Sequence, residues 1–331
     1  MDKFQGLILF LLLMFITSYW LFYGTFKDGV KMYRESHLSL QSKENRVSVE
    51  QTNTFPITSN NHVTIPLKKK GVIVYLLHEN EISNYLRSIE LLHKNFNMKY
   101  KYPILVFYEK SLKEESLNQV KLMTKSIASE VPLEYYYIKF EIPSHWDPVK
   151  QPVKVQWSLG YKCMIRFYFK EIFELPVIQQ YEYYWRLDTD SFILEEMSYD
   201  PFEKMKANNY AYGTIALDED AGPVVAGMTT MVQEYINTRP TNASLNSYTP
   251  NTRMVYNNFE VVQIDRFLDH RVLDFVDYID KSNNIFIRRW GDAPLRFAEL
   301  NLFFDWKKEV HIFCDIKYEH SHHSKIIYNK C

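Results

Sequence analysis

The sequence predicts an α/β fold, with a parallel β-sheet covered by helices on both faces. Residues 72–77 form an uninterrupted apolar run rich in β-branched side chains, which is typical of a parallel strand buried on both faces. Residues 81–96 then place apolar side chains at helical spacing, and a second apolar run follows at 102–108. These three segments predict a β-α-β unit with a right-handed crossover.

The same alternation continues along the next part of the chain. The further predicted segments are a helix at 112–129, a strand at 133–138, a helix at 161–173 and a strand at 182–187. Tyrosine-rich stretches occur within two of these strands, and we expect their rings to fill the core and the sheet faces, because large amphipathic rings in strands mostly do so. The chain has no GxGxxG turn or P-loop, so any phosphate binding must depend on a metal ion and side chains.

Composition limits the class of protein. The chain has 331 residues, enough for one large domain of about 250 residues or two small ones. Its net charge of −1 argues against nucleic acid as the main partner, because binding a phosphate backbone needs a clustered basic surface. The cysteines Cys163, Cys314 and Cys331 allow one disulfide and a spare thiol, but no disulfide framework and no CxxC zinc site.

The N-terminal segment predicts a membrane anchor. No charged residue lies between Gly6 and Tyr23, a length just sufficient to span a bilayer core, and no small-residue cleavage site follows. We therefore expect a cytoplasmic tip and transmembrane signal anchor at 1–24, a polar stem at 25–68 and a folded body at 69–331. The basic residues just after the segment favour the opposite orientation, whereas a glycosylation acceptor at Asn242 requires the body to face a lumen.

Two carboxylates end the strand at 182–187. Asp188 and Asp190, separated by Thr189, follow directly after the apolar and aromatic run. The carboxyl ends of strands in an open α/β sheet are where ligands bind, and carboxylates are suitable ligands for Mg²⁺ or Mn²⁺ bridging a diphosphate. The pattern indicates a nucleotide-sugar substrate, whereas a helix cap or a turn is the alternative for an isolated pair.

Several motifs share their order and spacing with one family. They are Phe140-Glu141-Ile142-Pro143-Ser144-His145-Trp146, Tyr161 with Met164 and Arg166-Phe167-Tyr168, Gln180 to Arg186, Tyr199-Asp200-Pro201-Phe202, Tyr212-Gly213, Asn258-Phe259-Glu260, Trp290-Gly291-Asp292-Ala293-Pro294, and Asp315-Ile316 with Tyr318 and His320. Through them, residues 71 to 322 resemble glycosyltransferase family 15, the fungal Golgi α-1,2-mannosyltransferases that use GDP-mannose and Mn²⁺.

The resemblance implies a GT-A-type fold, with a mixed, mostly parallel central sheet flanked by helices and an N-terminal transmembrane helix. It implies a lumenal catalytic domain at 69–331 in a single-pass type II protein of the Golgi or ER-Golgi membrane. The reaction would transfer mannose, with retention of configuration, from GDP-mannose to a mannosylated glycan or glycoprotein. The irregular loop at 218–256 bears on acceptor choice, and whether the acceptor is O-linked, N-linked or lipid stays open.

The resemblance also assigns roles to residues. The metal ligands of the family correspond to Asp188, where the family has glutamate, and to His320. Thr189 replaces the usual proline, and Asp190 can share the contact with the metal and diphosphate. At the reacting face are Glu260, as nucleophile or charge stabiliser, and Asp292, which either orients an acceptor hydroxyl or caps a helix. The remaining assignments are to nucleotide binding, and they fall on Tyr161, Arg166 and His78, the last standing where the family has arginine.

The spacing of Tyr161 and Arg166 adds one expectation. Residues five apart do not share one face of a helix, so at least one of the two is expected only to pack. Two alternatives to the whole assignment stay open at this point. One is a metal-dependent retaining glycosyltransferase that uses another nucleotide-sugar, and the other is a catalytically inactive lumenal sugar-binding protein of the same fold.

Overall fold

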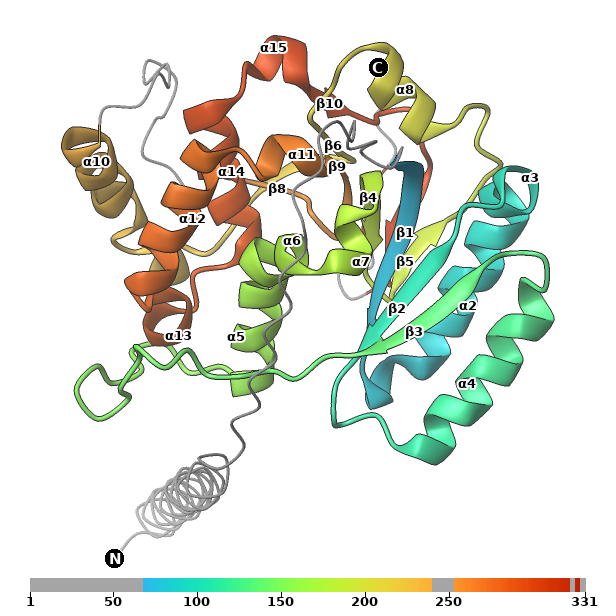
Figure 1. The fold of residues 1–331 in the computed structure, drawn as a ribbon, viewed down its shortest axis with the longest axis horizontal. Helices are drawn as coiled ribbons and strands as arrows, with labels where there is room; N and C mark the ends of the chain where they lie inside the picture. Colours follow the sequence, from blue (N-terminus) through green and yellow to red (C-terminus); the bar gives the residue numbers. More distant parts are fainter. Residues whose placement is uncertain (1–67, 240–252, 322–324, 328–331) are drawn as a thin grey trace, which may run out of the picture. The chain divides into compact units, whose positions relative to one another are not determined.

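A seven-stranded sheet runs through the part of the chain that the computed structural model describes, which is residues 68–239, 253–321 and 325–327 (Figure 1). The strand order is β10-β6-β9-β4-β1-β2-β3. The strands are β1 (Lys69–Leu77), β2 (Ile104–Tyr108), β3 (Leu133–Tyr137), β4 (Tyr181–Leu187), β6 (Tyr212–Thr214), β9 (Phe259–Gln263) and β10 (Val310–Ile312). Only β9 runs against its neighbours in this sheet, so the sheet is mixed and mostly parallel, as expected.

The strands predicted in the first half of the body are confirmed. β1 pairs in parallel with both β2 and β4, which makes it a central strand. Val72 and Val74 face one hydrophobic cluster, while Ile73 and Tyr75 face the other, and all four side chains are fully buried. Burial on both faces explains why this strand is an unbroken apolar run instead of an alternating one.

Helices cover both faces of the sheet (Figure 1). On one face lie α2 (Ile82–Leu92) and α4 (Glu114–Ile127), whose buried side chains belong to the cluster that contains Ile73 and Tyr75. On the other face lie α5 (Leu159–Arg166), α6 (Ile172–Glu174), α12 (His270–Lys281) and α14 (Asp292–Phe303), whose buried apolar side chains belong to the cluster that contains Val72 and Val74. This three-layer arrangement leaves the strand ends as the open edge of the sheet.

The other elements connect or extend these layers. They are η1 (Glu79–Glu81), η2 (His93–Asn97), α3 (Met98–Tyr100), η3 (Phe167–Glu171), α7 (Pro176–Gln179), α8 (Pro201–Ala207), α9 (Gly222–Val225), α10 (Met228–Thr238), α11 (Ile264–Phe267), α13 (Asn284–Arg288) and α15 (Trp306–Glu309). A small sheet joins β5 (Ser191–Ile193), β11 (Tyr318–His320) and β12 (Lys325–Ile327), and a ribbon joins β7 (Leu217–Glu219) to β8 (Arg253–Val255).

Two predicted helices are less regular than expected. The segment at 161–173 divides into α5, the π-helical turn η3 and α6, and the segment at 81–96 passes from α2 into the π-helical turn η2. A π turn inserts one residue and rotates the side chains that follow it relative to an ideal α-helix. Side-chain directions after such a turn therefore cannot be read from a 3.6-residue period.

Several sequence predictions concern residues outside the described ranges. The anchor at 1–24, the stem at 25–68 except Lys68, and the glycosylation acceptor Asn242 are among them, and these predictions stay open. Among the helices of the described residues, none is both long and apolar enough to cross a bilayer. Cys163 is a buried free thiol, whereas Cys314 is disulfide-bonded.

Candidate active site

A pocket of about 800 Å³ opens where the parallel strands end. Leu77 and His78 at the end of β1, Glu109 after β2 and Asp188 after β4 all line it. Its other walls come from the start of α5, the ribbon of β7 and β8, and the turn that begins α14. The carboxyl edge of a sheet is the usual ligand site of open α/β folds, because loops and helix starts converge there.

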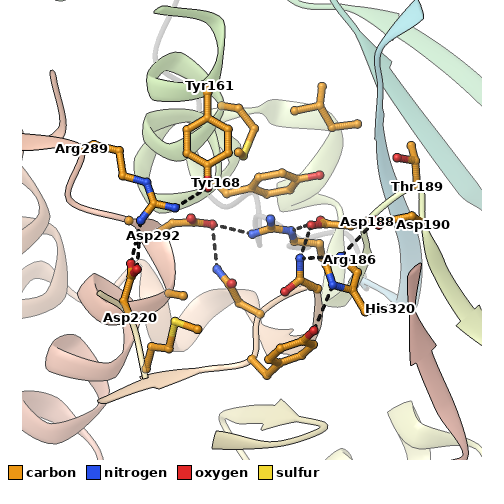
Figure 2. A pocket seen from close by; sticks show the side chains of 18 of the residues that line it. Tyr161, Tyr168, Arg186, Asp188, Thr189, Asp190, Asp220, Arg289, Asp292 and His320 are labelled. Carbon is orange, nitrogen blue, oxygen red and sulfur yellow. Dashed lines mark hydrogen bonds and ion pairs between the residues drawn. The ribbon is translucent and has the colours of Figure 1, made fainter. Parts of the chain in front are cut away.

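Asp188 and His320 meet at one point of this pocket (Figure 2). The side-chain amide nitrogen of Asn258 lies 2.6 Å from Asp188 Oδ2 and 3.2 Å from His320 Nε2. His320 Nε2 is also 3.1 Å from Asp190 Oδ1, and its Nδ1 is 3.0 Å from the hydroxyl of Tyr256. The structure therefore brings together the three residues that the Asp-x-Asp pattern and the family resemblance assign to metal and diphosphate.

The donor set fits a divalent cation. Asp188 Oδ2 and His320 Nε2 both lie within hydrogen-bonding distance of the same amide nitrogen of Asn258, so the two potential ligand atoms are close to each other. A carboxylate oxygen and a neutral imidazole nitrogen are common ligands of Mn²⁺, and the diphosphate and water would complete its coordination. Within the described residues there is no group of three or more His, Cys, Asp or Glu side chains that could hold a metal by themselves.

Arg186 lies at the centre of the site and was not among the residues singled out from the sequence. Its Nε donates to Asp188 Oδ1 at 2.9 Å and its Nη1 donates to Asp292 Oδ2 at 2.6 Å. The guanidinium also stacks on the ring of Tyr168, with its carbon 3.5 Å from the ring centroid. Burial lowers the pKa of Arg186, but Asp188 and Asp292 more than compensate, so its pKa is held well above the usual range and it stays charged.

Glu260 lies behind Arg186 instead of lining the pocket. Its side chain is 1% exposed, and its Oε1 is 3.9 Å from Arg186 Nη1. Tyr184 and Tyr212 each donate a hydroxyl hydrogen bond to one of its carboxylate oxygens, at 3.1 and 2.8 Å. Burial raises the pKa of Glu260, while the hydrogen bond from Tyr212 and the nearby arginines, Arg186 among them, oppose this shift.

Asp292 and Tyr161 line the pocket on the side away from the metal ligands. Asp292 is the first residue of α14 and accepts hydrogen bonds from Arg186 and, at 2.7 Å, from the side chain of Asn257. The hydroxyl of Tyr161 accepts a hydrogen bond of 2.8 Å from Arg289, which also binds both carboxylate oxygens of Asp220 at 3.1 and 2.8 Å. In Figure 2, Tyr161, Arg289 and Asp220 lie on one side of Arg186, and Asp190 and His320 lie on the other.

The predicted nucleotide ligands divide between the pocket and another part of the fold. His78 lines the pocket at the end of β1, and its Nε2 is 3.9 Å from Glu109 Oε1. Arg166 does not line it, which runs against its predicted role in phosphate binding: its Nε and Nη2 bind Asp280 of α12 at 2.7 and 3.0 Å. The five-residue spacing explains this, because Tyr161 and Arg166 leave α5 on different faces.

Comparison with known proteins identifies the family. The sequence pattern of the glycolipid 2-alpha-mannosyltransferase family matches residues 27–329. The O-glycoside alpha-1,2-mannosyltransferase omh1 of Schizosaccharomyces pombe is 29% identical over 277 residues, which are 77% of this chain and 70% of that protein. The probable mannosyltransferase KTR3 of Saccharomyces cerevisiae is 27% identical over 275 residues, 76% of this chain and 67% of that protein.

Solved structures share the fold. The crystal structure of the mannosyltransferase Ktr4p from S. cerevisiae gives a TM-score of 0.71 at 24% identity, covering 85% of this chain and 78% of that one. Core-mannan synthase A from Aspergillus fumigatus, in its Mn/GDP form, gives a TM-score of 0.64 at 24% identity, covering 79% and 76%. With the family match over nearly the whole chain, the protein belongs to the glycolipid 2-alpha-mannosyltransferase family and is a glycosyltransferase.

Proposed function

We propose that this protein is a retaining α-1,2-mannosyltransferase of the GT-A type, which transfers mannose from GDP-mannose to a mannose-containing acceptor. One observation carries the proposal: in a chain of the mannosyltransferase family, Asp188 and His320 converge at the end of β4, inside a pocket at the carboxyl edge of the sheet. The relatives in the comparison are named as mannosyltransferases, and one solved relative holds Mn and GDP, which supports the same donor chemistry here.

Asp188 and His320 would hold the metal ion, with Asp190 close to His320 Nε2. When bound, Mn²⁺ would neutralise the diphosphate and so favour its departure from the sugar. The chain itself fixes the orientation of Asp188, because Arg186 binds Oδ1 and Asn258 binds Oδ2 of that carboxylate. Asp is one methylene shorter than the glutamate of the family, so the carboxylate of Asp188 lies closer to the strand. The two hydrogen bonds hold it in that position.

Asp292 is suited to orient the acceptor hydroxyl, because its carboxylate lines the pocket and is itself held by Arg186 and Asn257. Glu260 is suited to balance the positive charge of Arg186 from behind, and through Arg186 it acts on the pocket electrostatically. Its burial and its position outside the pocket lining support this electrostatic role over direct attack on the sugar. Tyr161 presents its hydroxyl to the same half of the pocket.

The cellular setting is part of the proposal and depends on sequence alone. The uncharged segment Gly6–Tyr23 supports a type II anchor, and the acceptor sequence at Asn242 supports a lumenal body. We propose that the protein is a single-pass protein of the Golgi or ER-Golgi membrane. To test the lumenal orientation, the parent chain and an Asn242→Gln variant are compared for a glycan that an endoglycosidase removes. Loss of one such glycan in the variant would support a lumenal body.

The test of activity uses the full-length chain in detergent. With Mn²⁺ and a panel of α-mannosides, GDP-mannose should be consumed in preference to UDP-sugars, and the product should carry an α-1,2 linkage. Asp188→Ala and His320→Ala should each lower kcat/KM by about 10²-fold or more, since second-sphere changes alone cost 10- to 100-fold in metal sites. Glu195→Ala, at an exposed carboxylate paired with Lys317, is the control.

The outcomes separate the alternatives. Preferred turnover of a UDP-sugar would indicate a transferase with another donor, and mannoside binding without turnover of any donor would indicate a sugar-binding protein. Full activity in the Asp188→Ala variant would contradict the assignment of the metal site.

A further inference from the structure

Trp157 exposes its ring at the rim of the pocket. The side chain lines the pocket and the residue is 49% exposed, in a segment, 156–160, whose residues are all exposed. It directly precedes Ser158, whose hydroxyl caps α5 by accepting from the backbone N–H of Tyr161 at 3.2 Å. The rings of Trp157 and Tyr161 are 4.9 Å apart and inclined by 31°. An exposed indole held beside a pocket is a candidate binding surface.

The residues behind Trp157 hold the ring in place. The guanidinium of Arg289 lies 4.7 Å from the Trp157 ring centroid and 5.2 Å from that of Tyr161. Arg289 has a φ of 63°, a left-handed conformation that side chains other than glycine adopt rarely. Its two bonds to Asp220 and its bond to Tyr161 anchor the guanidinium in this position. The indole is therefore supported by a fixed cation and a second ring, which reduces the entropy lost on binding.

The position of Trp157 identifies the part of the substrate that it would meet. The predicted metal ligands and His78 lie toward the ends of β4 and β1, so we place the diphosphate at that end and reassign Tyr161, a predicted nucleotide ligand, to the acceptor side. Trp157 contacts Tyr161 and Arg289, which lie on the other side of Arg186 (Figure 2). Asp292, 8% exposed, lies deeper on this side, whereas Trp157 is at the rim. A sugar that extends outward from the reacting acceptor mannose would meet the indole.

We propose that Trp157 forms an outer acceptor subsite, in which the indole stacks on the second sugar of an oligosaccharide acceptor. The inference rests on the proposed function and names its substrate class as mannosides of two or more sugars. The C–H face of a pyranose is apolar, so covering it with an aromatic ring removes apolar surface from water, while its hydroxyls stay directed to the sides. Asp218 and Glu219 of β7 line the same pocket and supply carboxylates that can accept hydrogen bonds from sugar hydroxyls.

The test compares a one-sugar and a two-sugar acceptor. For the full-length chain, the KM for methyl α-mannobioside should be lower than that for methyl α-mannoside. Trp157→Ala should raise the KM for the mannobioside roughly tenfold, equivalent to about 1.4 kcal/mol, and leave the KM values for methyl α-mannoside and GDP-mannose unchanged. Trp157→Phe should recover most of the difference. Leu159→Ala removes a neighbouring side chain that is 40% exposed and lies outside the pocket lining, and it should change none of these values.

Three results would overturn the subsite. They are an equal rise in KM for both acceptors, no change for either acceptor, and a raised KM for GDP-mannose, which would place the indole at the nucleotide. Calorimetric binding of the mannobioside to the protein with Mn²⁺ and GDP gives the same comparison without turnover. If the parent chain transfers no mannose, but Trp157→Ala still binds the mannobioside more weakly than the parent chain does, the result would count against the proposed function alone. Equal binding by the parent and Trp157→Ala would count against the subsite alone.

Discussion

Replacing Arg186 by methionine tests whether this buried cation holds the site together. The methionine keeps an apolar stem against Tyr168 but removes the two hydrogen bonds, of 2.9 and 2.6 Å, to Asp188 and Asp292. Hydrogen bonds to charged groups contribute about 1.5–3 kcal/mol each, and breaking a buried ion pair costs about 3–5 kcal/mol. Because the Asp188 side chain is 24% exposed, solvent weakens its share, and we expect a loss of about 4 kcal/mol in the free energy of unfolding.

The loss should depend on pH in a defined direction. Burial already raises the pKa of Glu260, and Arg186 is one of the cations that oppose the shift, so Arg186→Met should raise this pKa further. A carboxyl group whose pKa is higher in the folded than in the unfolded state loses stability as the pH rises through the folded value. The difference in stability between the parent and Arg186→Met should therefore be larger at pH 8 than at pH 5.

Scanning calorimetry of the full-length chain at both pH values measures this difference. For a body of this size, each kcal/mol corresponds to about 2–4 °C, so the melting temperature at pH 8 should fall by roughly 8–16 °C. Arg266→Met, which breaks a more exposed ion pair with Glu309, should lower it by no more than a few degrees. A change in Arg186→Met no larger than that in Arg266→Met, or one independent of pH, would refute the reasoning.

Three further predictions concern residues around the site. Arg166→Met should leave the KM for GDP-mannose unchanged while lowering the free energy of unfolding by about 1–3 kcal/mol, because Arg166 pairs with Asp280 and Glu171 and not with the substrate. A raised KM would support its predicted role in phosphate binding. Tyr212→Phe removes a 2.8 Å hydrogen bond that favours ionised Glu260 and so raises the pKa of Glu260. The acidic limb of the plot of kcat/KM against pH should therefore move to higher pH. An unchanged acidic limb would argue against an ionised Glu260 in the reaction. Burial lowers the pKa of His311 to about 4, so between pH 6.5 and pH 4 the unfolded state binds a proton that the folded state does not. The parent chain should therefore lose roughly 1–3 kcal/mol of stability over that range, after allowing for partial exposure, and His311→Phe should not show this loss. Equal losses in both proteins would exclude this histidine as the cause.

The first half of the fold could be predicted from the sequence because its strands are buried on both faces. Continuous apolar runs at β1 and β2 carry that signal in the residues themselves. The later strands β6, β9 and β10 are three to five residues long, and β9 contains a buried glutamate, so no apolar pattern marks them. The antiparallel direction of β9 depends on its pairing with β4 and β6, which short-range patterns do not encode.

The candidate site could be predicted in part for a related reason. Motif spacing indicated Asp188 and His320, whereas Arg186 was noted as the end of an aromatic strand and of a family motif and was given no role in the site. The signal that could have found it is a charged residue within the apolar run 183–187, which needs a buried partner. For Arg166 the decisive fact is Asp280, 114 residues further along the chain, which no local pattern brings near it.

The active site depends on contacts between residues that are far apart in sequence. Asn258 precedes β9 and bonds Asp188 across 70 residues, and Asp292 reaches Arg186 across 106. Contacts this far apart in sequence form slowly, because closing a long loop costs chain entropy before the contact can stabilise it. A nascent chain that stops before β9 can contain the whole β1–β4 core and still lack Glu260, Asp292 and His320. Enzymatic activity therefore requires that the C-terminal third has been synthesised and has paired with the core, so activity can be used as a measure of complete synthesis.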